Sequence, residues 1–102
     1  MATLEEITER IRCAAAALAD VGRSIKFDLK GEGFIHIDGA SITNEDRPAD
    51  LVVTLSRKDL EALGRRELDP MRAVMTGRMK LSDMGLAMKL QPAIQILFSK
   101  AV

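Results

Sequence analysis

The most constraining feature of this sequence is a switch in the spacing of its apolar residues. From Leu4 to Leu18 they recur at helical spacing, whereas from Ile25 to Lys30 apolar and charged residues alternate strictly. Helical spacing turns one apolar stripe toward a core, and alternation turns every second side chain toward one face of a sheet. The chain must therefore pack a helix and a half-buried sheet around one core.

The sequence also predicts where that first helix begins and ends. Thr3 and Glu6 match a capping box at its start, and Val21-Gly22 ends it. The run from Ala14 to Ala17 presents small side chains, which favours close packing against another element over a functional role.

Four strands are predicted in the stretch that follows the first helix. Gly31-Glu32-Gly33 supplies a hairpin turn between the first two, and Gly39 turns the chain before the third, which is the weakest. A polar loop over residues 44–48 precedes the fourth. In order, the predicted strands cover residues 25–30, 34–38, 40–44 and 51–56.

Residues that start and stop helices return after the fourth strand. Ser56 caps a short helix that Gly64 ends, and Asp69-Pro70 opens another that Gly77 ends. The alternation then resumes and predicts a fifth strand. Two apolar helices follow, and Pro92 is expected to end the first of them and separate it from the second. These last elements cover residues 78–82, 84–90 and 93–100.

This order of elements predicts an α+β fold in one domain, residues 1–102. A strand meander followed by helices favours a five-stranded, mostly antiparallel sheet with helices covering one face. Because the fifth strand arrives after a helical crossover, it can pair in parallel with a strand of the meander.

Composition excludes several classes of protein. The formal net charge is zero, so we expect no nucleic-acid partner. The single cysteine, Cys13, cannot form an internal disulfide, which favours a reducing, cytoplasmic location. No charge-free apolar run approaches the ~20 residues of a membrane span, and the charged N-terminus does not resemble a signal peptide.

The residue types that most often carry catalysis are scarce. His36 is the only histidine, and we expect it at an exposed or edge position opposite Ile35 and Ile37. Nothing in the sequence brings it near Cys13, as a Cys-His pair would require. No metal-ligand spacing is present, and the Gly31-x-Gly33 pair joins two strands instead of opening a helix. We therefore expect no catalytic site, no cofactor and no metal.

The distribution of methionine stands out instead. Apart from Met1, all five lie between Met71 and Met88. Methionine serves either as filler in an ordinary core or as an adaptable apolar surface. The two C-terminal helices also carry more apolar surface than one face of the sheet needs, which leaves a ligand cavity, a dimer interface or a membrane surface as its use.

Residues 77–91, which read Gly-Arg-Met-Lys-Leu-Ser-Asp-Met-Gly-Leu-Ala-Met-Lys-Leu-Gln, resemble the C-terminal signature of the sterol carrier protein 2 family. Residues 49–56 and 68–77 are similar to that family's strand and helix, and the resemblance as a whole runs in order from about Ile25 to Phe98. It implies an α+β layer in which a tunnel between sheet and helices takes sterols, fatty acids, acyl-CoAs or other lipids without catalysis.

The resemblance also implies which residues contact the ligand. Inward strand residues and the methionine cluster would form the walls, the last helix a lid, and Gln91 either a head-group anchor or a solvent-exposed helix end. The expected ligand-binding residues are Phe27, Leu29, Leu51, Val53, Leu55, Met75, Met79, Leu81, Met84, Met88, Gln91, Ile94, Leu97 and Phe98.

Two departures from the family pattern refine this expectation. The chain ends Ser99-Lys100-Ala101-Val102 where eukaryotic carriers often carry a peroxisomal Ser-Lys-Leu type signal, and Phe34 stands where many relatives carry Trp. A freestanding bacterial-type carrier is the closest picture. The partners expected are a lipid, transiently a membrane surface, and either a second copy or an enzyme, the last if the domain presents a lipid intermediate such as a quinone precursor.

Overall fold

Five strands form one mixed sheet in the computed structural model, which describes residues 3–12, 22–39 and 41–100. Three of the four neighbouring strand pairs are antiparallel, so the expected mostly antiparallel sheet is confirmed. In the order in which they lie across the sheet, the strands are β3 (Ser41–Thr43), β2 (Phe34–Asp38), β1 (Ser24–Asp28), β4 (Leu51–Leu55) and β5 (Met79–Leu81).

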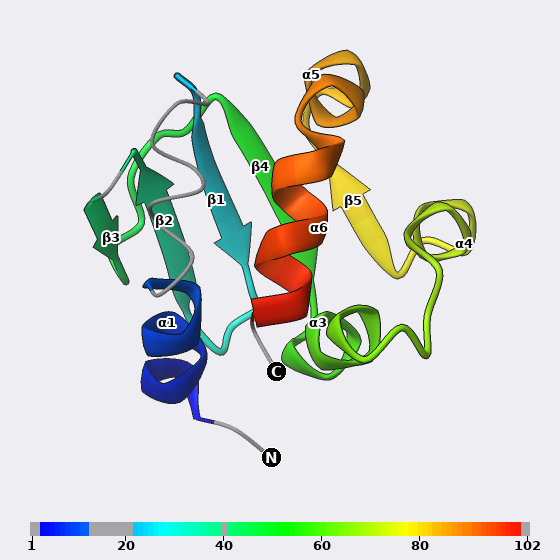
Figure 1. Cartoon of the computed structure of the whole chain (residues 1–102), viewed down its shortest axis with the longest axis horizontal. Coiled ribbons are helices and arrows are strands. Elements are labelled where there is room, and N and C mark those ends of the chain that lie inside the picture. The colour runs from blue at the N-terminus through cyan, green and yellow to red at the C-terminus, as the bar shows by residue number, and fades with distance from the viewer. Residues whose placement is uncertain (1–2, 13–21, 40, 101–102) are drawn as a thin grey trace.

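The helices cover one face and one edge of this sheet (Figure 1). α6 crosses in front of β4 and packs against α3, α5 and α1, whereas α4 lies beside β5. The α+β fold expected from the sequence is therefore confirmed. The helices are α1 (Leu4–Arg12), α3 (Arg57–Gly64), α4 (Pro70–Met75), α5 (Met84–Lys89) and α6 (Gln91–Lys100).

Side-chain caps fix the starts of α3 and α4 as the sequence predicts. Ser56 Oγ accepts a hydrogen bond from the backbone N–H of Asp59 at 3.0 Å, and Asp69 accepts one from the N–H of Met71 at 3.4 Å. Asp83 caps α5 in the same way through the N–H of Leu86, at 3.0 Å. The far end of the first helix, the alanine run and Cys13 lie outside the described residues.

The expected break at Pro92 is wrong. α5 ends at Lys89 and α6 begins at Gln91, so Pro92 lies in the first turn of α6. A proline is accommodated there because the first N–H groups of a helix have no partner within it. The last helix is therefore longer at its start than expected.

The single parallel pair joins β1 to β4, so the expectation of a parallel β5 is also wrong. After β3, residues 44–50 return the chain over the face of the sheet opposite the helices. There Asp46 pairs with Lys26 at 2.6 Å, and the carbonyl oxygen of Pro48 lies 3.0 Å from Nε2 of His36. This return brings β4 beside β1 in the same direction. It also covers His36, which is 5% exposed on a strand paired on both sides, so the expected exposed or edge position of His36 is wrong.

The start of β4 is also held to β1 by a side-chain contact. Asp50 accepts hydrogen bonds from the backbone N–H of Ser24 at 2.9 Å and from its hydroxyl at 3.3 Å. The Ser24 backbone N–H is the largest cause that lowers the pKa of the Asp50 carboxyl. Burial opposes this shift, and the Ser24 hydroxyl and Arg23 lower the pKa by smaller amounts.

The core fills the space between the sheet and the helices. Phe27 of β1 and Phe98 of α6 meet there with ring centroids 6.0 Å apart, and both are buried. Phe98 also lines an apolar pocket on the other side of its ring, so it connects the core to that pocket. The other fully buried large residues are Ile7, Ile11, Ile25, Leu29, Ile35, Ile37, Leu51, Leu55, Leu60 and Leu97.

Candidate functional site

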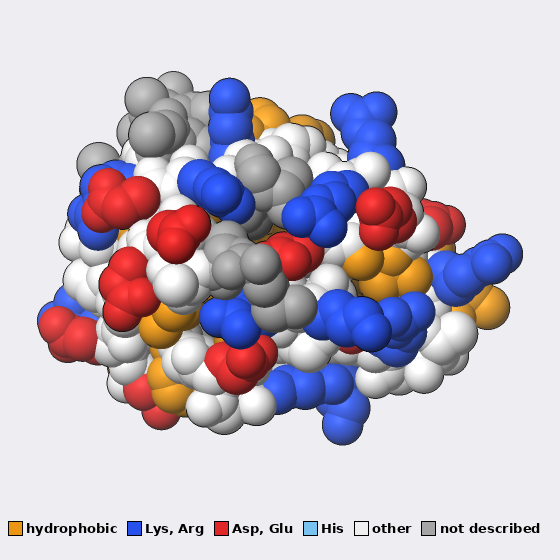
Figure 2. Space-filling model, turned by 90° about the horizontal axis from the view of Figure 1, so that it is seen from below, with side chains coloured by type: hydrophobic (Ala, Val, Ile, Leu, Met, Phe, Trp, Pro, Cys, Tyr) orange, Lys and Arg blue, Asp and Glu red, His pale blue; other side chains and the backbone are white. Residues whose placement is uncertain are grey.

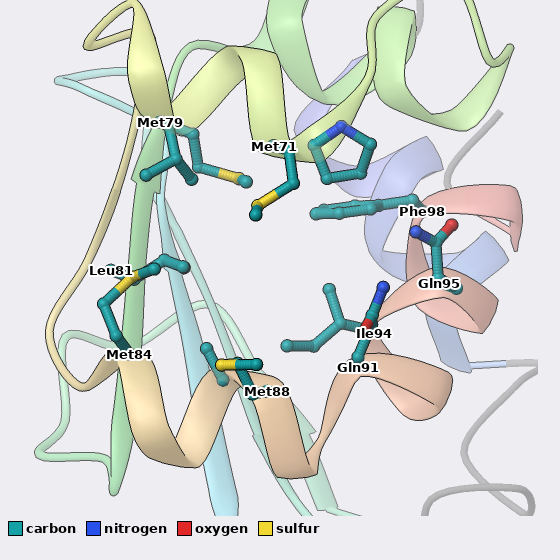
Figure 3. A pocket seen from close by; sticks show the side chains of 12 residues that line it. Met71, Met79, Leu81, Met84, Met88, Gln91, Ile94, Gln95 and Phe98 are labelled. Carbon is teal, nitrogen blue, oxygen red and sulfur yellow. The ribbon is translucent and has the colours of Figure 1, made fainter.

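An apolar pocket of about 180 Å³ lies at the β5 edge, between α4, β5, α5 and α6 (Figure 3). All of its described lining side chains are apolar except for Gln91 and Gln95. The lining residues are Pro70, Met71, Val74, Met79, Leu81, Met84, Ala87, Met88, Gln91, Ile94, Gln95 and Phe98.

Helical spacing explains how these residues come to face one space. Gln91, Ile94, Gln95 and Phe98 stand at i, i+3, i+4 and i+7 on α6, which is one face of a helix. The lining residues of α5 follow the same spacing, at positions 84, 87 and 88. On β5, alternation turns Met79 and Leu81 to this side and leaves Lys80 on the other.

Burial falls steeply from the floor of the pocket to its mouth. Phe98 and Met79 are 1% and 4% exposed, whereas Met71 and Met88, on α4 and α5, are 65% and 70% exposed. In Figure 3 the side chains of Met71, Met84 and Met88 project into the space between their helices. The pocket therefore has buried walls at the core and exposed, unbranched methionine side chains at the opening.

The structure brings half of the residues predicted from the sequence to this pocket. The seven that line it are Met79, Leu81, Met84, Met88, Gln91, Ile94 and Phe98.

The other seven predicted residues lie elsewhere. Met75 is 83% exposed on α4 and lines a separate shallow hollow with Met71. Six residues are fully buried in the core between α6 and the sheet, where side chains fill the space. They are Phe27, Leu29, Leu51, Val53, Leu55 and Leu97.

Five lining residues were missed by the sequence-based prediction. Gln95 stands one turn after Gln91, and Ala87 one turn before Gln91 on the preceding helix, so helical spacing could have indicated both. The remaining three, Pro70, Met71 and Val74, come from α4, and no sequence signal shows which side of so short a helix faces α5.

A ligand in this pocket would be buried among apolar side chains and could hydrogen-bond to amide groups. None of its described lining residues is titratable, and the described part of the chain contains no cluster of three or more residues that could hold a metal ion. Gln91 and Gln95 are exposed at its edge, and each amide can both donate and accept a hydrogen bond. No described helix is long and apolar enough to cross a membrane.

Solved structures with this arrangement share the fold over most of their length. The crystal structure of sterol carrier protein 2 like 2 from Aedes aegypti has a TM-score of 0.71 and 24% identity, covering 85% of this chain and 92% of that one. The solution structure of Aedes aegypti sterol carrier protein 2 in complex with palmitate has a TM-score of 0.68 and 17% identity, covering 90% and 94%. At these identities the likeness establishes the fold.

The sequence comparisons establish the family. Sterol carrier protein 2 of Bos taurus is 41% identical over 54 residues, which are 52% of this chain and 10% of the bovine protein. The match thus spans about a tenth of the length of that relative. The family model described as the SCP-2 sterol transfer family matches residues 4–95. The chain therefore belongs to the SCP-2 sterol transfer family.

Proposed function

We propose that this protein binds a lipid in the pocket between α4, β5, α5 and α6 and carries it without chemical conversion. The observation that supports this most directly is the lining: ten apolar side chains and two amides around an open space. The palmitate complex of a protein with the same fold supports a ligand with a long acyl chain.

The binding free energy of such a ligand comes from burial. Each CH₂ group moved from water into the pocket contributes roughly 0.8 kcal/mol, so an acyl chain binds without a charged anchor. The methionines at the mouth have three side-chain torsions each and can rearrange around chains of different shape. This adaptability favours a broad class of lipids over one lipid species.

The polar end of the ligand lies at Gln91 and Gln95 in this proposal. These side chains are one turn apart on α6, at the edge of the pocket (Figure 3). An amide hydrogen-bonds equally well to a hydroxyl and to a carboxyl group, so the pair accommodates sterols, fatty acids and esters.

The buried strand residues enter the site only when it widens. Phe98 separates the pocket from Phe27, with ring centroids 6.0 Å apart. A ligand longer than the observed space reaches the sheet if Phe98 rotates, and the six buried residues predicted from the sequence then join the lining. Met75 stays outside the proposed site, because it faces the separate hollow on α4.

Native mass spectrometry of the purified protein, followed by extraction of the bound molecule, tests the proposal. We expect a monomer with a copurified lipid, and saturable binding of the fluorescent fatty acid cis-parinaric acid to the delipidated protein. A dimer that carries no lipid and binds neither this probe nor a fluorescent sterol would contradict the proposal and favour a homodimeric module. Lipid that passes only to a copurified enzyme would favour the accessory role.

Substitutions that fill the pocket locate the site. Val74→Trp introduces a large ring at a half-buried lining position and is expected to weaken cis-parinaric acid binding by at least about tenfold, or ~1.4 kcal/mol. Gln95→Trp fills the same space from an exposed position, so any loss of binding in this variant is not caused by misfolding of the core. The matched control is Ile96→Trp, on the same helix but outside the lining, and it should bind like the wild type.

A further inference from the structure

The exposed large apolar side chains of this protein lie on one part of the chain. Within the described residues they are Met71, Met75, Met84, Met88 and Ile96, with exposed fractions from 39% to 83%. A monomeric protein rarely leaves several large apolar groups together in water without a partner for them. Four of the five belong to the two short helices beside the pocket.

These four methionines surround the opening of the pocket. Met71 and Met75 stand one turn apart on α4, and Met84 and Met88 one turn apart on α5. Met71, Met84 and Met88 line the pocket itself, and Met75 continues the apolar surface into the adjoining hollow. We call these four residues the methionine rim.

Charge divides the chain in the same way. Residues 69–100, which carry the pocket, hold five Lys or Arg against two Asp or Glu, whereas residues 1–68 hold ten against thirteen. The neutral chain therefore has a cationic part with a net charge of +3 and an anionic part with −3. Figure 2 shows both signs of charge on one face: acidic side chains predominate toward α1, and Lys and Arg gather toward α4 and toward α3, whose basic residues belong to residues 1–68 and do not add to the +3.

Two cations flank the methionine rim directly. Arg72 follows Met71 and shares the hollow with Met75, and Lys89 follows Met88. Both are exposed, and neither forms an ion pair with any residue that the structure describes. Unpaired cations beside protruding apolar groups complement a surface that is anionic and has an apolar interior.

We propose that the methionine rim docks the mouth of the pocket onto the surface of an anionic lipid bilayer. The methionines enter the boundary between head groups and acyl chains while Arg72 and Lys89 meet the anionic head groups. A second copy of the chain fits this surface poorly, since a symmetric dimer through it would bring Arg72 and Lys89 of both copies together. Docking the mouth also lets an apolar ligand leave without crossing water, and this step rests on the proposed lipid-binding function.

Vesicle flotation measures the docking. We expect the protein to bind phosphatidylcholine vesicles that contain phosphatidylserine and not to bind vesicles of pure phosphatidylcholine. Binding to the anionic vesicles should weaken as the salt concentration is raised. Arg72→Glu combined with Lys89→Glu should weaken binding by at least about 25-fold, since each cation near an anionic bilayer contributes about fivefold. Met75→Asp should weaken it by about tenfold, because one apolar side chain no longer enters the lipid.

Tryptophan fluorescence locates the contact, because the chain contains no Trp and no Tyr. A Trp placed by Met75→Trp should be quenched when the vesicles carry brominated acyl chains, whereas a Trp placed by Ile96→Trp on α6 should not. Equal quenching at both positions would overturn the proposed orientation.

The two proposals fail in distinguishable ways, because Met75 lies outside the pocket lining. Met75→Asp should retain cis-parinaric acid binding while it loses vesicle binding. A wild-type protein that binds the fatty acid but no anionic vesicle overturns the docking proposal and leaves the proposed function standing. Docking is also overturned if Met75→Asp and the combined Arg72→Glu and Lys89→Glu variant float with anionic vesicles as well as the wild type does. It is equally overturned if these variants keep vesicle binding and lose only dimerisation or binding to an acidic protein.

Discussion

The apolar residues of the sheet around β1, β2 and β4 are buried, whereas many of those in the segment from α4 to α6 are exposed. Every inward-facing residue of those three strands is at most 2% exposed, whereas four methionines of α4 and α5 are 47% to 83% exposed. The strand residues are mostly β-branched, aromatic or leucine, with few rotamers, and the α4–α5 residues are largely methionine.

The difference shows how one small core can support both a fixed shape and an adaptable surface. α4 and α5 have only six residues each, so most of their stability must come from contacts with β5 and α6. The sheet beneath does not depend on the methionine rim for its own burial. Ligand binding and folding stability should therefore respond to different residues.

Truncating one apolar side chain in each region gives the largest expected contrast. Phe27→Ala removes a fully buried ring that packs on Phe98, and should lower the free energy of unfolding by about 3–5 kcal/mol. Met88→Ala removes a side chain that is 70% exposed, and should change stability by no more than about 0.5 kcal/mol while weakening lipid binding. Urea unfolding and cis-parinaric acid titration of both variants measure the contrast.

A loss of several kcal/mol in Met88→Ala would contradict this division, because it would place α5 in the stabilising core. Unchanged lipid binding in the same variant would remove Met88 from the site.

The sequence predicted most of the elements because their signals are local. Alternation located β1, β2 and β4, and the side chains of Ser56 and Asp69 located two helix starts. The pairing of β4 with β1 and the burial of His36 escaped prediction for one shared reason. Both depend on residues 44–50 crossing the outer face of the sheet, and no local pattern encodes where a loop returns.

The candidate site was predictable to the extent that helical spacing determines it. The pocket residues of α5 and α6 predicted from the sequence resemblance share one face of each helix, so they remain together in the structure. The strand residues have the apolar character expected of a lipid site, but Phe27 is covered by Phe98 of α6. Only the packing of α6 on the sheet distinguishes a pocket wall from a core residue.

The same glycine substitution should have opposite effects in the two regions. Gly33, after the turn that joins β1 to β2, has φ +129°, and an added Cβ would lie 2.6 Å from Cδ2 of Leu4. Gly33→Ala should therefore destabilise by about 1–3 kcal/mol. Gly85, in α5, has room for a Cβ, whose nearest neighbour is 3.5 Å away, so Gly85→Ala should stabilise by about 0.5–1 kcal/mol.

Thermal unfolding of the two glycine variants measures both signs. Destabilisation by Gly85→Ala would mean that α5 does not hold the helical backbone seen beside the pocket. A neutral Gly33→Ala would mean that α1 does not pack against the β1–β2 hairpin through Leu4.

The smallest expected effect concerns the hydrogen bonds between Asp50 and Ser24, which join β4 to β1 and should stabilise the protein near neutral pH but not in strong acid. The pKa of Asp50 is lowered from its ordinary value of 3.8, chiefly by the Ser24 backbone N–H. A depressed pKa in the folded state stabilises the protein above pH 3.8, and this contribution disappears as the pH falls through the lower, folded-state value.

Asp50→Asn should therefore lose stability near neutral pH and converge on the wild type in acid. The matched control is Asp38→Asn, because Asp38 lies opposite Ser24 on β2 and carries the same charge without a hydrogen bond to it among the described residues. Urea midpoints measured for the three proteins across this pH range provide the comparison. If Asp50→Asn and Asp38→Asn follow the same pH profile, general surface charge and not the Ser24 contact stabilises the parallel pair.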